Sequence, residues 1–249
     1  NAPFFLYTEG AIVPEGVTHL RVDHSVAAVP TRAFAHHHQL KEVVLPEGIQ
    51  EIGVRAFRDC LALECINFPS TLTAIGFGAF AGCVSLTEVE LDLSNKVTTS
   101  ITTIGNWAFQ RCTSLERIAI PSTLTAIGAG VFNGCISLKE VKLCEGLQRI
   151  EMLAFRNCTS LEQFQIPSTV SAIGDRAFHG CVSLREVKLV VGIQDIGRYA
   201  FTTCRSLEPI AVPSKAFVIE TGVYLNDFGI ETEYHHNCRL LTDGTITPE

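Results

Sequence analysis

Seven cysteines recur along the chain at a spacing that raises the question of thiol chemistry. Each follows a phenylalanine by three residues, at Cys60, Cys83, Cys112, Cys135, Cys158, Cys181 and Cys204. Residues that recur at one place in a repeat occupy one place in the fold, and a free cysteine there behaves as a small apolar group. Adjacent repeats stack about 4.8 Å apart, so a disulfide between neighbouring thiols is geometrically open. A run of seven equivalent cysteines nevertheless favours packing, and we expect a buried ladder without catalytic role.

Three further cysteines, Cys65, Cys144 and Cys238, fall outside this ladder. Cys65 stands on the solvent side of an expected strand. Two interpretations of it stay open, an accessible reactive thiol or an exposed residue without a role.

Histidines cluster towards the two ends of the chain, at 36–38 and at 235–236. A metal site needs several such ligands to converge. In a stack of repeats the clusters lie on the order of 40 Å apart, at one strand spacing per repeat, so we expect neither a metal site nor a bound cofactor. Serines also recur at one repeat position, as in Ser85 and Ser114, and we interpret them as turn hydroxyls that bond to the backbone. No nucleophile and base are brought together by these patterns, and we expect that the chain is not an enzyme.

The elements that position these residues follow from the repeat itself, whose anchor is a phenylalanine preceded by alanine or valine. The anchor recurs at intervals of 23 residues, with one interval of 29, at Phe34, Phe57, Phe80, Phe109, Phe132, Phe155, Phe178 and Phe201. Leucine follows it by six residues in every copy, and isoleucine precedes it by five residues in seven copies. Such a period predicts a solenoid, because no single coil buries its own apolar side and neighbouring coils must stack.

Within one coil the pattern predicts a strand, a turn and a bend. Nine and eleven residues after the phenylalanine stand apolar residues, such as Val187 and Leu189 with the polar Lys188 between them, which indicates a short strand. The glycine that follows the isoleucine, as in Gly53, suggests a turn with an unusual backbone angle. The sequence Ala-Phe-x-x-Cys sets its apolar residues on one face of a short helical turn. We therefore expect one strand per coil, with short helical turns or irregular segments on the convex side.

The ends and one insertion depart from the pattern. The repeats span 20–224, and the segments 1–19 and 225–249 are expected to be an N-terminal cap and a degenerate C-terminal cap or tail, so that 1–249 form a single solenoid domain. The longer interval places an insertion at 92–103. It is a polar loop that either belongs to a binding face or has no role.

Composition excludes several classes of partner. The chain has 249 residues, of which 47% are hydrophobic and 18% charged, a composition typical of a protein with a packed core. Its formal net charge of −7 argues against nucleic-acid backbones and anionic membrane surfaces. No apolar run approaches the roughly 20 residues of a membrane span, and no signal peptide follows Asn1. We expect no membrane insertion, and the compartment stays open.

The segment from Ile173 to Leu189 reads Ile-Gly-x-x-Ala-Phe-x-x-Cys-x-Ser-Leu-x-x-Val-x-Leu, and this pattern resembles the BspA-like leucine-rich-repeat family. The resemblance implies an α/β repeat fold, a right-handed leucine-rich-repeat solenoid with one short parallel strand per coil. It also implies a protein-binding or adhesive role and a possible place at the cell surface or in secretion. It supplies no catalytic residues.

Two sets of variable positions are candidates for partner contact. The first set points to solvent from the expected sheet, alternates in sign and contains no aromatic residue, which disfavours glycans and single-stranded nucleic acids. It suits a protein partner, or it is only a solvated face. The candidates there are Glu88, Glu90, Arg117, Lys142, Gln165 and Lys188.

The second set stands just before the Ala-Phe pair, where most coils have small or polar residues. Larger apolar residues occur there at Phe77, Trp107, Met152, Leu153 and Tyr199. A grouped and exposed apolar set marks an interaction surface, whereas the alternative is partial burial against neighbouring bends.

These observations together favour a non-enzymatic scaffold for protein–protein interaction. We expect a protein partner, which the sequence does not name, and no nucleic acid or small-molecule substrate. The alternative is a secreted or cell-surface adhesin that binds host or matrix ligands.

Overall fold

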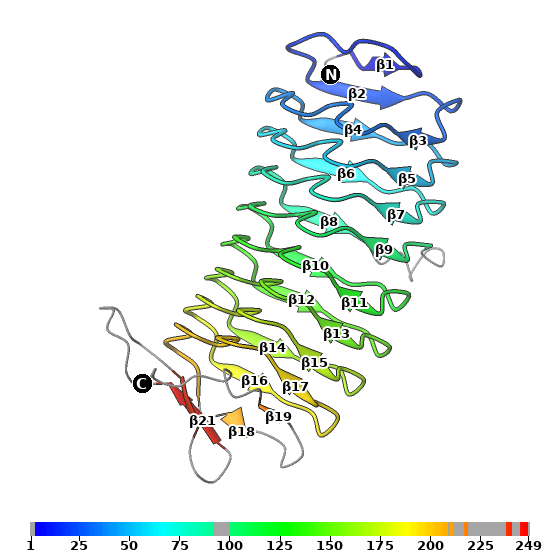
Figure 1. Cartoon of the computed structure of the whole chain (residues 1–249). Helices are drawn as coiled ribbons and strands as arrows, with labels where there is room; N and C mark the ends of the chain where they lie inside the picture. The colour runs from blue at the N-terminus through cyan, green and yellow to red at the C-terminus, as the bar shows by residue number, and fades with distance from the viewer. Residues whose placement is uncertain are drawn as a thin grey trace.

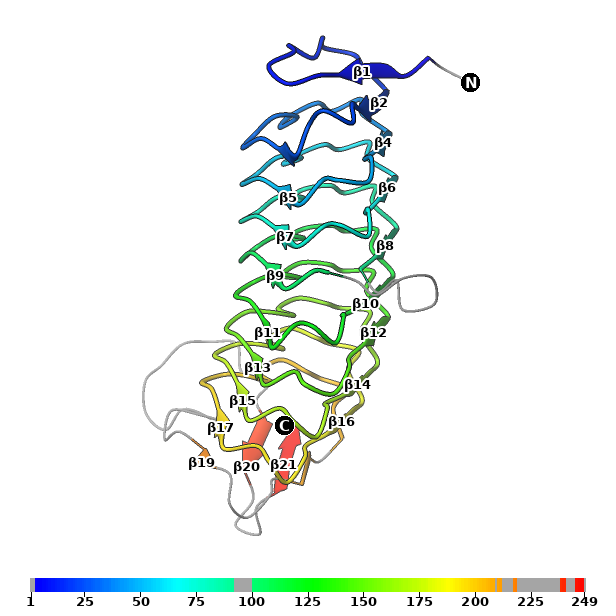
Figure 2. The same ribbon diagram turned by 90° about the vertical axis from the view of Figure 1, so that its right-hand side faces the viewer.

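The computed structural model describes residues 3–91 and 100–208, together with four short strands beyond them, β18 (Ile210–Ala211), β19 (Phe217–Val218), β20 (Cys238–Leu240) and β21 (Thr245–Pro248). The described coils stack into an elongated parallel β-solenoid of about seven turns (Figure 1). Figure 2 shows the same coils edge-on, each lying against the next along the stack.

The first sheet contains the predicted strands and runs along one side of the stack. Its strands pair in parallel, and their inward residues meet in register, so that Leu20 lies beside Val43 and Val43 beside Ile66. Burial alternates along each strand, as in β8, where Val89 is buried between two exposed glutamates. The strands are β1 (Phe5–Tyr7), β2 (His19–Val22), β4 (Glu42–Val44), β6 (Cys65–Asn67), β8 (Glu88–Glu90), β10 (Arg117–Ala119), β12 (Glu140–Lys142), β14 (Gln163–Gln165) and β16 (Glu186–Lys188).

Each coil also contains a second strand, so the prediction of one strand per coil was incomplete. The second strand has two residues and includes the isoleucine that precedes the phenylalanine. It pairs in parallel with its neighbours, as Ile150 does with Ile173. These strands are β3 (Ala28–Val29), β5 (Glu51–Ile52), β7 (Ala74–Ile75), β9 (Thr103–Ile104), β11 (Ala126–Ile127), β13 (Arg149–Ile150), β15 (Ala172–Ile173) and β17 (Asp195–Ile196), followed by β19.

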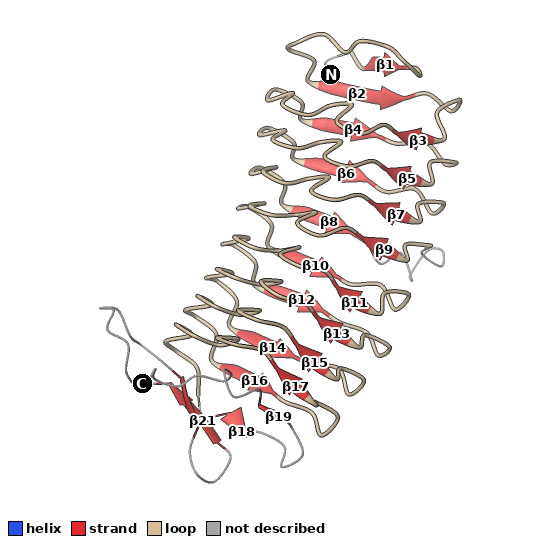
Figure 3. Cartoon of the chain, viewed as in Figure 1, coloured by secondary structure: helices blue, strands red, loops and turns tan. Residues whose placement is uncertain are grey.

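The predicted helical turns are wrong, because the described residues contain no helix (Figure 3). Two left-handed residues instead flank each phenylalanine, as Arg55 (φ 56°) and Asp59 (φ 57°) flank Phe57. A right-handed helical run cannot pass through such residues. Their N–H groups bond to the next coil, and the Phe57 N–H donates to the Ala79 carbonyl at 2.8 Å. We call the row of bends around the phenylalanines the bend edge.

The glycine after the isoleucine has a different role from the one predicted. In the described copies it is not among the residues with positive φ. A Cβ atom added at Gly174 would instead lie 2.4 Å from the backbone nitrogen of Met152 in the preceding coil. This position is glycine because two backbones approach closely.

The core is a continuous column of aromatic rings. The eight phenylalanines are at most 1% exposed, and the rings of Phe57 and Phe80 stack with centroids 5.2 Å apart. At the N-terminal end the Tyr7 ring packs edge-on against Phe34, with centroids 4.9 Å apart. Because each ring packs on the next, the stacked coils share one core.

Hydrogen-bonded pairing lapses at three places. In the first sheet it lapses between β6 and β8 and between β12 and β14, and in the second sheet between β9 and β11.

The predicted insertion and C-terminal cap are described only in part. Of the predicted insertion 92–103, residues 92–99 lie outside the described residues, and residues 100–103 lead into β9. The predicted C-terminal cap, 225–249, is described only in β20 and β21, which pair antiparallel with each other.

Candidate functional site

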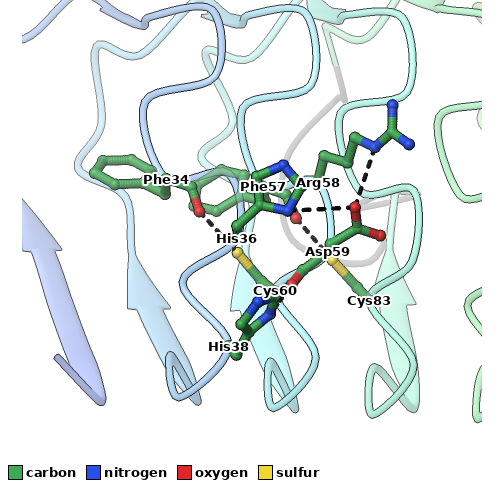
Figure 4. Close-up of polar contacts among 8 residues, drawn as sticks. All are labelled: Phe34, His36, His38, Phe57, Arg58, Asp59, Cys60 and Cys83. Carbon is green, nitrogen blue, oxygen red and sulfur yellow. Dashed lines mark hydrogen bonds and ion pairs between the residues drawn. The ribbon is translucent and has the colours of Figure 1, made fainter. Parts of the chain in front are cut away.

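The cysteine ladder lies beside the phenylalanine column and bonds to it. The Cys60 thiol donates to the carbonyl oxygen of Phe34 at 3.1 Å, and the Cys83 thiol donates to that of Phe57 at 3.1 Å (Figure 4). The same bond recurs in the five later coils, at 3.1 to 3.3 Å. The thiols at positions 60, 83, 112, 135, 158 and 181 form no disulfide. These cysteines therefore have a structural role in the fold.

Burial also sets the chemistry of these thiols. It raises the pKa of Cys60 and of Cys135 to about 12, and it raises the pKa of Cys112 well above the ordinary value. The thiolate is the nucleophilic form, so these groups stay protonated and inert at neutral pH. The exposed Cys65 has a raised pKa as well, because of partial burial and then the nearby Glu42 and Glu64. This shift disfavours a reactive role for Cys65.

The histidines at 36 and 38 both contact Asp59, His36 at its carboxylate and His38 at its backbone carbonyl oxygen, 2.9 Å from the His38 Nδ1. Asp59 lies 3.5 Å from the His36 Nδ1 and 3.2 Å from the Arg58 Nε (Figure 4). Within the described residues, no group of three or more histidine, cysteine, aspartate or glutamate side chains forms a metal site. His235 and His236 lie outside the residues that the structure describes.

The described part of the chain contains no helix with the length and apolar character needed to cross a membrane.

Four of the strand-face candidates take part in ion pairs, and one of these pairs joins two candidates. The Arg117 guanidinium lies 2.6 Å from the Glu88 carboxylate on the adjacent strand. Lys142 lies 3.6 Å from Glu140, and Lys188 lies 3.1 Å from Glu186. Exposed pairs of this kind contribute about 0–1 kcal/mol each. These pairs balance part of the charge on this face locally.

A cleft opens in the strand face where pairing lapses between β12 and β14. Its volume is about 1090 Å³, and its lining includes Lys142, Gln165 and Lys188. Glu88, Glu90 and Arg117 stand on β8 and β10 and do not line it. The structure thus brings together three of the six strand-face candidates. The repeat pattern gave no signal for this cleft, because β12 and β14 both match it.

On the bend edge the structure brings Phe77 and Trp107 together. They line a hollow of about 250 Å³, which we call the aromatic hollow, together with Arg55, Arg58 and Gln110. Phe77 is 40% exposed, whereas Trp107 is half-buried. The Arg55 guanidinium lies over the Phe77 ring, 5.5 Å from its centroid.

The other edge candidates lie elsewhere. Met152 is 46% exposed and does not line the aromatic hollow. Tyr199 is half-buried, and the guanidinium groups of Arg176 and Arg198 lie 5.1 and 4.7 Å from its ring centroid. Four coils separate Trp107 from Tyr199, or about 19 Å at one strand spacing per coil. The edge candidates therefore do not form one patch.

Two small residues create the aromatic hollow. Gly78 and Ala81 line its floor and occupy the coil positions that Arg55 and Arg58 occupy in the preceding coil. A second hollow of about 470 Å³, which we call the arginine hollow, lies beside it and is lined by Arg32, Ala35, His36, Arg55 and Arg58. Sequence reasoning missed these arginines. The sequence signal that could have identified them is the change from arginine to a small residue at equivalent positions of two successive coils.

Bacterial leucine-rich repeat proteins are among the solved structures similar to this chain. A leucine-rich repeat protein from Bacteroides ovatus ATCC 8483 is 25% identical with a TM-score of 0.63, and the match covers 88% of this chain and 63% of that one. A leucine rich cell surface protein from Faecalibacterium prausnitzii A2-165 is 27% identical with a TM-score of 0.63, and the match covers 83% of this chain and 65% of that one. The chain thus spans less than two thirds of the length of either protein.

Sequence comparison places the chain more directly. No curated protein sequence matches it. The profile described as BspA type leucine rich repeat region, with 6 copies, matches residues 16–103 and 102–231. The match covers most of the chain and agrees with the stacked coils, the buried leucines and the phenylalanine column. The chain belongs to the BspA-type leucine-rich repeat family.

Proposed function

We propose that the chain is a single-domain, non-enzymatic scaffold for protein–protein interaction. The observation that supports this proposal is the contrast between buried and exposed positions of the coil. The phenylalanine, cysteine and leucine positions are almost uniform and buried, whereas the exposed positions differ from coil to coil. A rigid stack thereby presents an extended, non-repeating surface, as repeat scaffolds that bind proteins do.

The chemistry of the described residues supports a binding role over catalysis. The ladder thiols are buried and protonated, and several charged residues of the strand face are held in exposed ion pairs. A nucleophile needs an adjacent base or a lowered pKa. The raised thiol pKa values point the other way.

Affinity capture with matched surface variants tests this proposal. The immobilised chain is incubated with extracts and with secreted proteins of its source, and the recovered proteins are identified by mass spectrometry. We expect at least one protein whose recovery falls with Glu88→Lys, on the strand face, or with Trp107→Ala, on the bend edge. Val191→Ser changes an 82% exposed residue outside both candidate sets and is the control. Identical recovery by wild type and all three variants at several salt concentrations would contradict the proposal.

The second candidate function is a cell-surface adhesin for host or matrix ligands. It is favoured by the similarity to the Faecalibacterium prausnitzii protein, which is described as a cell surface protein. Protease treatment of intact cells, followed by immunoblotting of the complete gene product, tests it. We expect the solenoid to be accessible to the protease, and full protection in intact cells with cleavage after lysis would end this hypothesis.

A further inference from the structure

We propose that the aromatic hollow receives one aromatic side chain of an acidic partner segment, and that Arg55, Arg58 and Arg32 bind the carboxylates beside it. This inference rests on the proposed role as a protein-binding scaffold and names the chemistry of the partner. It is carried by the size of the hollow, by its charge and by the arrangement of two hollows along the stack.

The size of the aromatic hollow suits one side chain. Its volume of about 250 Å³ lies below the roughly 300–1,000 Å³ of sites for small molecules. Phe77 and Trp107 provide flat apolar walls, against which an aromatic ring packs favourably. A single aromatic anchor in such a pocket is the common centre of a protein interface.

The charge of both hollows selects an acidic partner. No acidic residue lines either hollow, although the whole chain has a formal net charge of −7. Among the described residues Arg55 has no carboxylate within ion-pairing distance, and its Nε atom is buried without a hydrogen-bond partner. Arg58 shares Asp59 with His36. Guanidinium groups bind carboxylates in a two-pronged geometry, and Arg55 is free to do so.

The two hollows lie side by side on the bend edge, because both are lined by Arg55 and Arg58. The aromatic hollow extends from there to Trp107, and the arginine hollow extends the other way to Arg32. One coil spacing is about 4.8 Å, and an extended chain advances about 3.3 Å per residue. An extended segment that runs along the stack would thus place a carboxylate one to three residues from its aromatic anchor.

Trp107 reports directly on this site, because it is the one tryptophan in the chain. The probe is a capped peptide, acetyl-Asp-Asp-Gly-Phe-Gly-amide, titrated into the full chain while tryptophan emission is recorded. We expect a saturable change in emission. Replacement of both aspartates by asparagine, or of the phenylalanine by glycine, should weaken binding by about tenfold or more.

Two variants block the site in different ways. Gly78→Leu fills the aromatic hollow, and the fold accepts leucine there because Leu153 occupies the equivalent position at φ 61°. Arg55→Gln removes the cation next to Phe77. We expect each to weaken binding of the peptide by about tenfold or more. Arg176→Gln changes the equivalent arginine in a distant coil, and binding should stay within about twofold of wild type. Circular dichroism and thermal melting verify that all three variants fold.

Three results would overturn the inference. They are no saturable change with the acidic aromatic peptide, equal binding by Gly78→Leu, or equally tight binding of the asparagine peptide. Inorganic phosphate and a short single-stranded oligonucleotide are tested as competitors, and displacement by either at the concentration of the peptide would show a general anion site instead. If Gly78→Leu leaves the capture of a partner intact while Glu88→Lys abolishes it, the scaffold function stands and this docking site does not.

Discussion

The thiol of Cys83 donates a hydrogen bond to the backbone carbonyl oxygen of Phe57 in the preceding coil, at 3.1 Å. The same oxygen accepts the N–H of Cys60 within its own coil at 3.2 Å. Each ladder cysteine therefore links its coil to the preceding one by a hydrogen bond beside the aromatic column. This relationship gives a physical reason for cysteine at a position where size alone would admit several small residues.

Cys83→Ala should lower the free energy of unfolding by about 1–2 kcal/mol, because it removes a hydrogen bond and leaves a small cavity. Urea unfolding followed by circular dichroism measures the change. Cys65→Ala is the control, since Cys65 is exposed on β6, and its effect should stay within about 0.5 kcal/mol. Equal effects of the two substitutions would mean that the thiol–carbonyl bond contributes nothing.

Gly174→Ala should lower the free energy of unfolding by about 1–3 kcal/mol. The added Cβ atom would lie 2.4 Å from the Met152 nitrogen, and backbone atoms cannot move aside without disturbing the pairing of β13 with β15. Glu151→Ala is the matched control, because it puts alanine at the same position of the preceding coil, where a Cβ atom already stands. We expect a change there within about 0.5 kcal/mol. A similar loss in both variants, measured by chemical denaturation, would contradict the close-approach argument.

The coil was largely predictable from the sequence, and its bend was not. The periodic positions of phenylalanine, leucine and cysteine identified the core, because burial repeats with the coil. The second strand escaped prediction because two residues, such as Arg149–Ile150, are too few to show an alternating pattern. The helical turn was wrong because Ala-Phe-x-x-Cys has helical spacing, whereas the N–H groups of the bend bond to the next coil instead of within their own.

The candidate site was predictable in part for the same reason. Phe77 and Trp107 stood out as large residues at variable positions. Arg55 and Arg58 did not, because their importance comes from Gly78 and Ala81 one coil away. A surface made by stacking depends on residues that are distant in the sequence, and a repeat pattern read one copy at a time does not reveal it.

Arg111→Gly should raise the free energy of unfolding by about 0.5–1 kcal/mol. Arg111 is exposed and has a φ of 58°, a conformation that costs an L-residue about 1–2 kcal/mol, while the greater freedom of glycine in the unfolded chain offsets part of the gain. Three other coils already have glycine at this position, at Gly82, Gly134 and Gly180. Arg111→Ala keeps the Cβ atom and should give no gain. Stabilisation by alanine as well as glycine, seen as equal rises in Tm, would point to the charge and not to the backbone.

The free energy of unfolding should fall steeply with rising pH in the alkaline range, because the folded chain keeps its buried thiols protonated. In the unfolded chain a cysteine has a pKa of about 8.5, whereas burial raises the pKa of Cys60 and Cys135 to about 12 in the fold. Below about pH 8.5 both states keep their protons and no stability is lost. Above it the unfolded chain releases protons that the folded chain retains, so the free energy of unfolding falls by about 1.4 kcal/mol per pH unit for each such thiol.

Two variants test this pH dependence. Cys135→Ala should reduce the slope of the free energy of unfolding against pH by the contribution of about one thiol. Cys65→Ser, at an exposed position, should change this slope least. Urea titrations between pH 8 and pH 10.5 measure the slope, and a flat profile across that range would show that the ladder thiols do not set the alkaline limit of the fold.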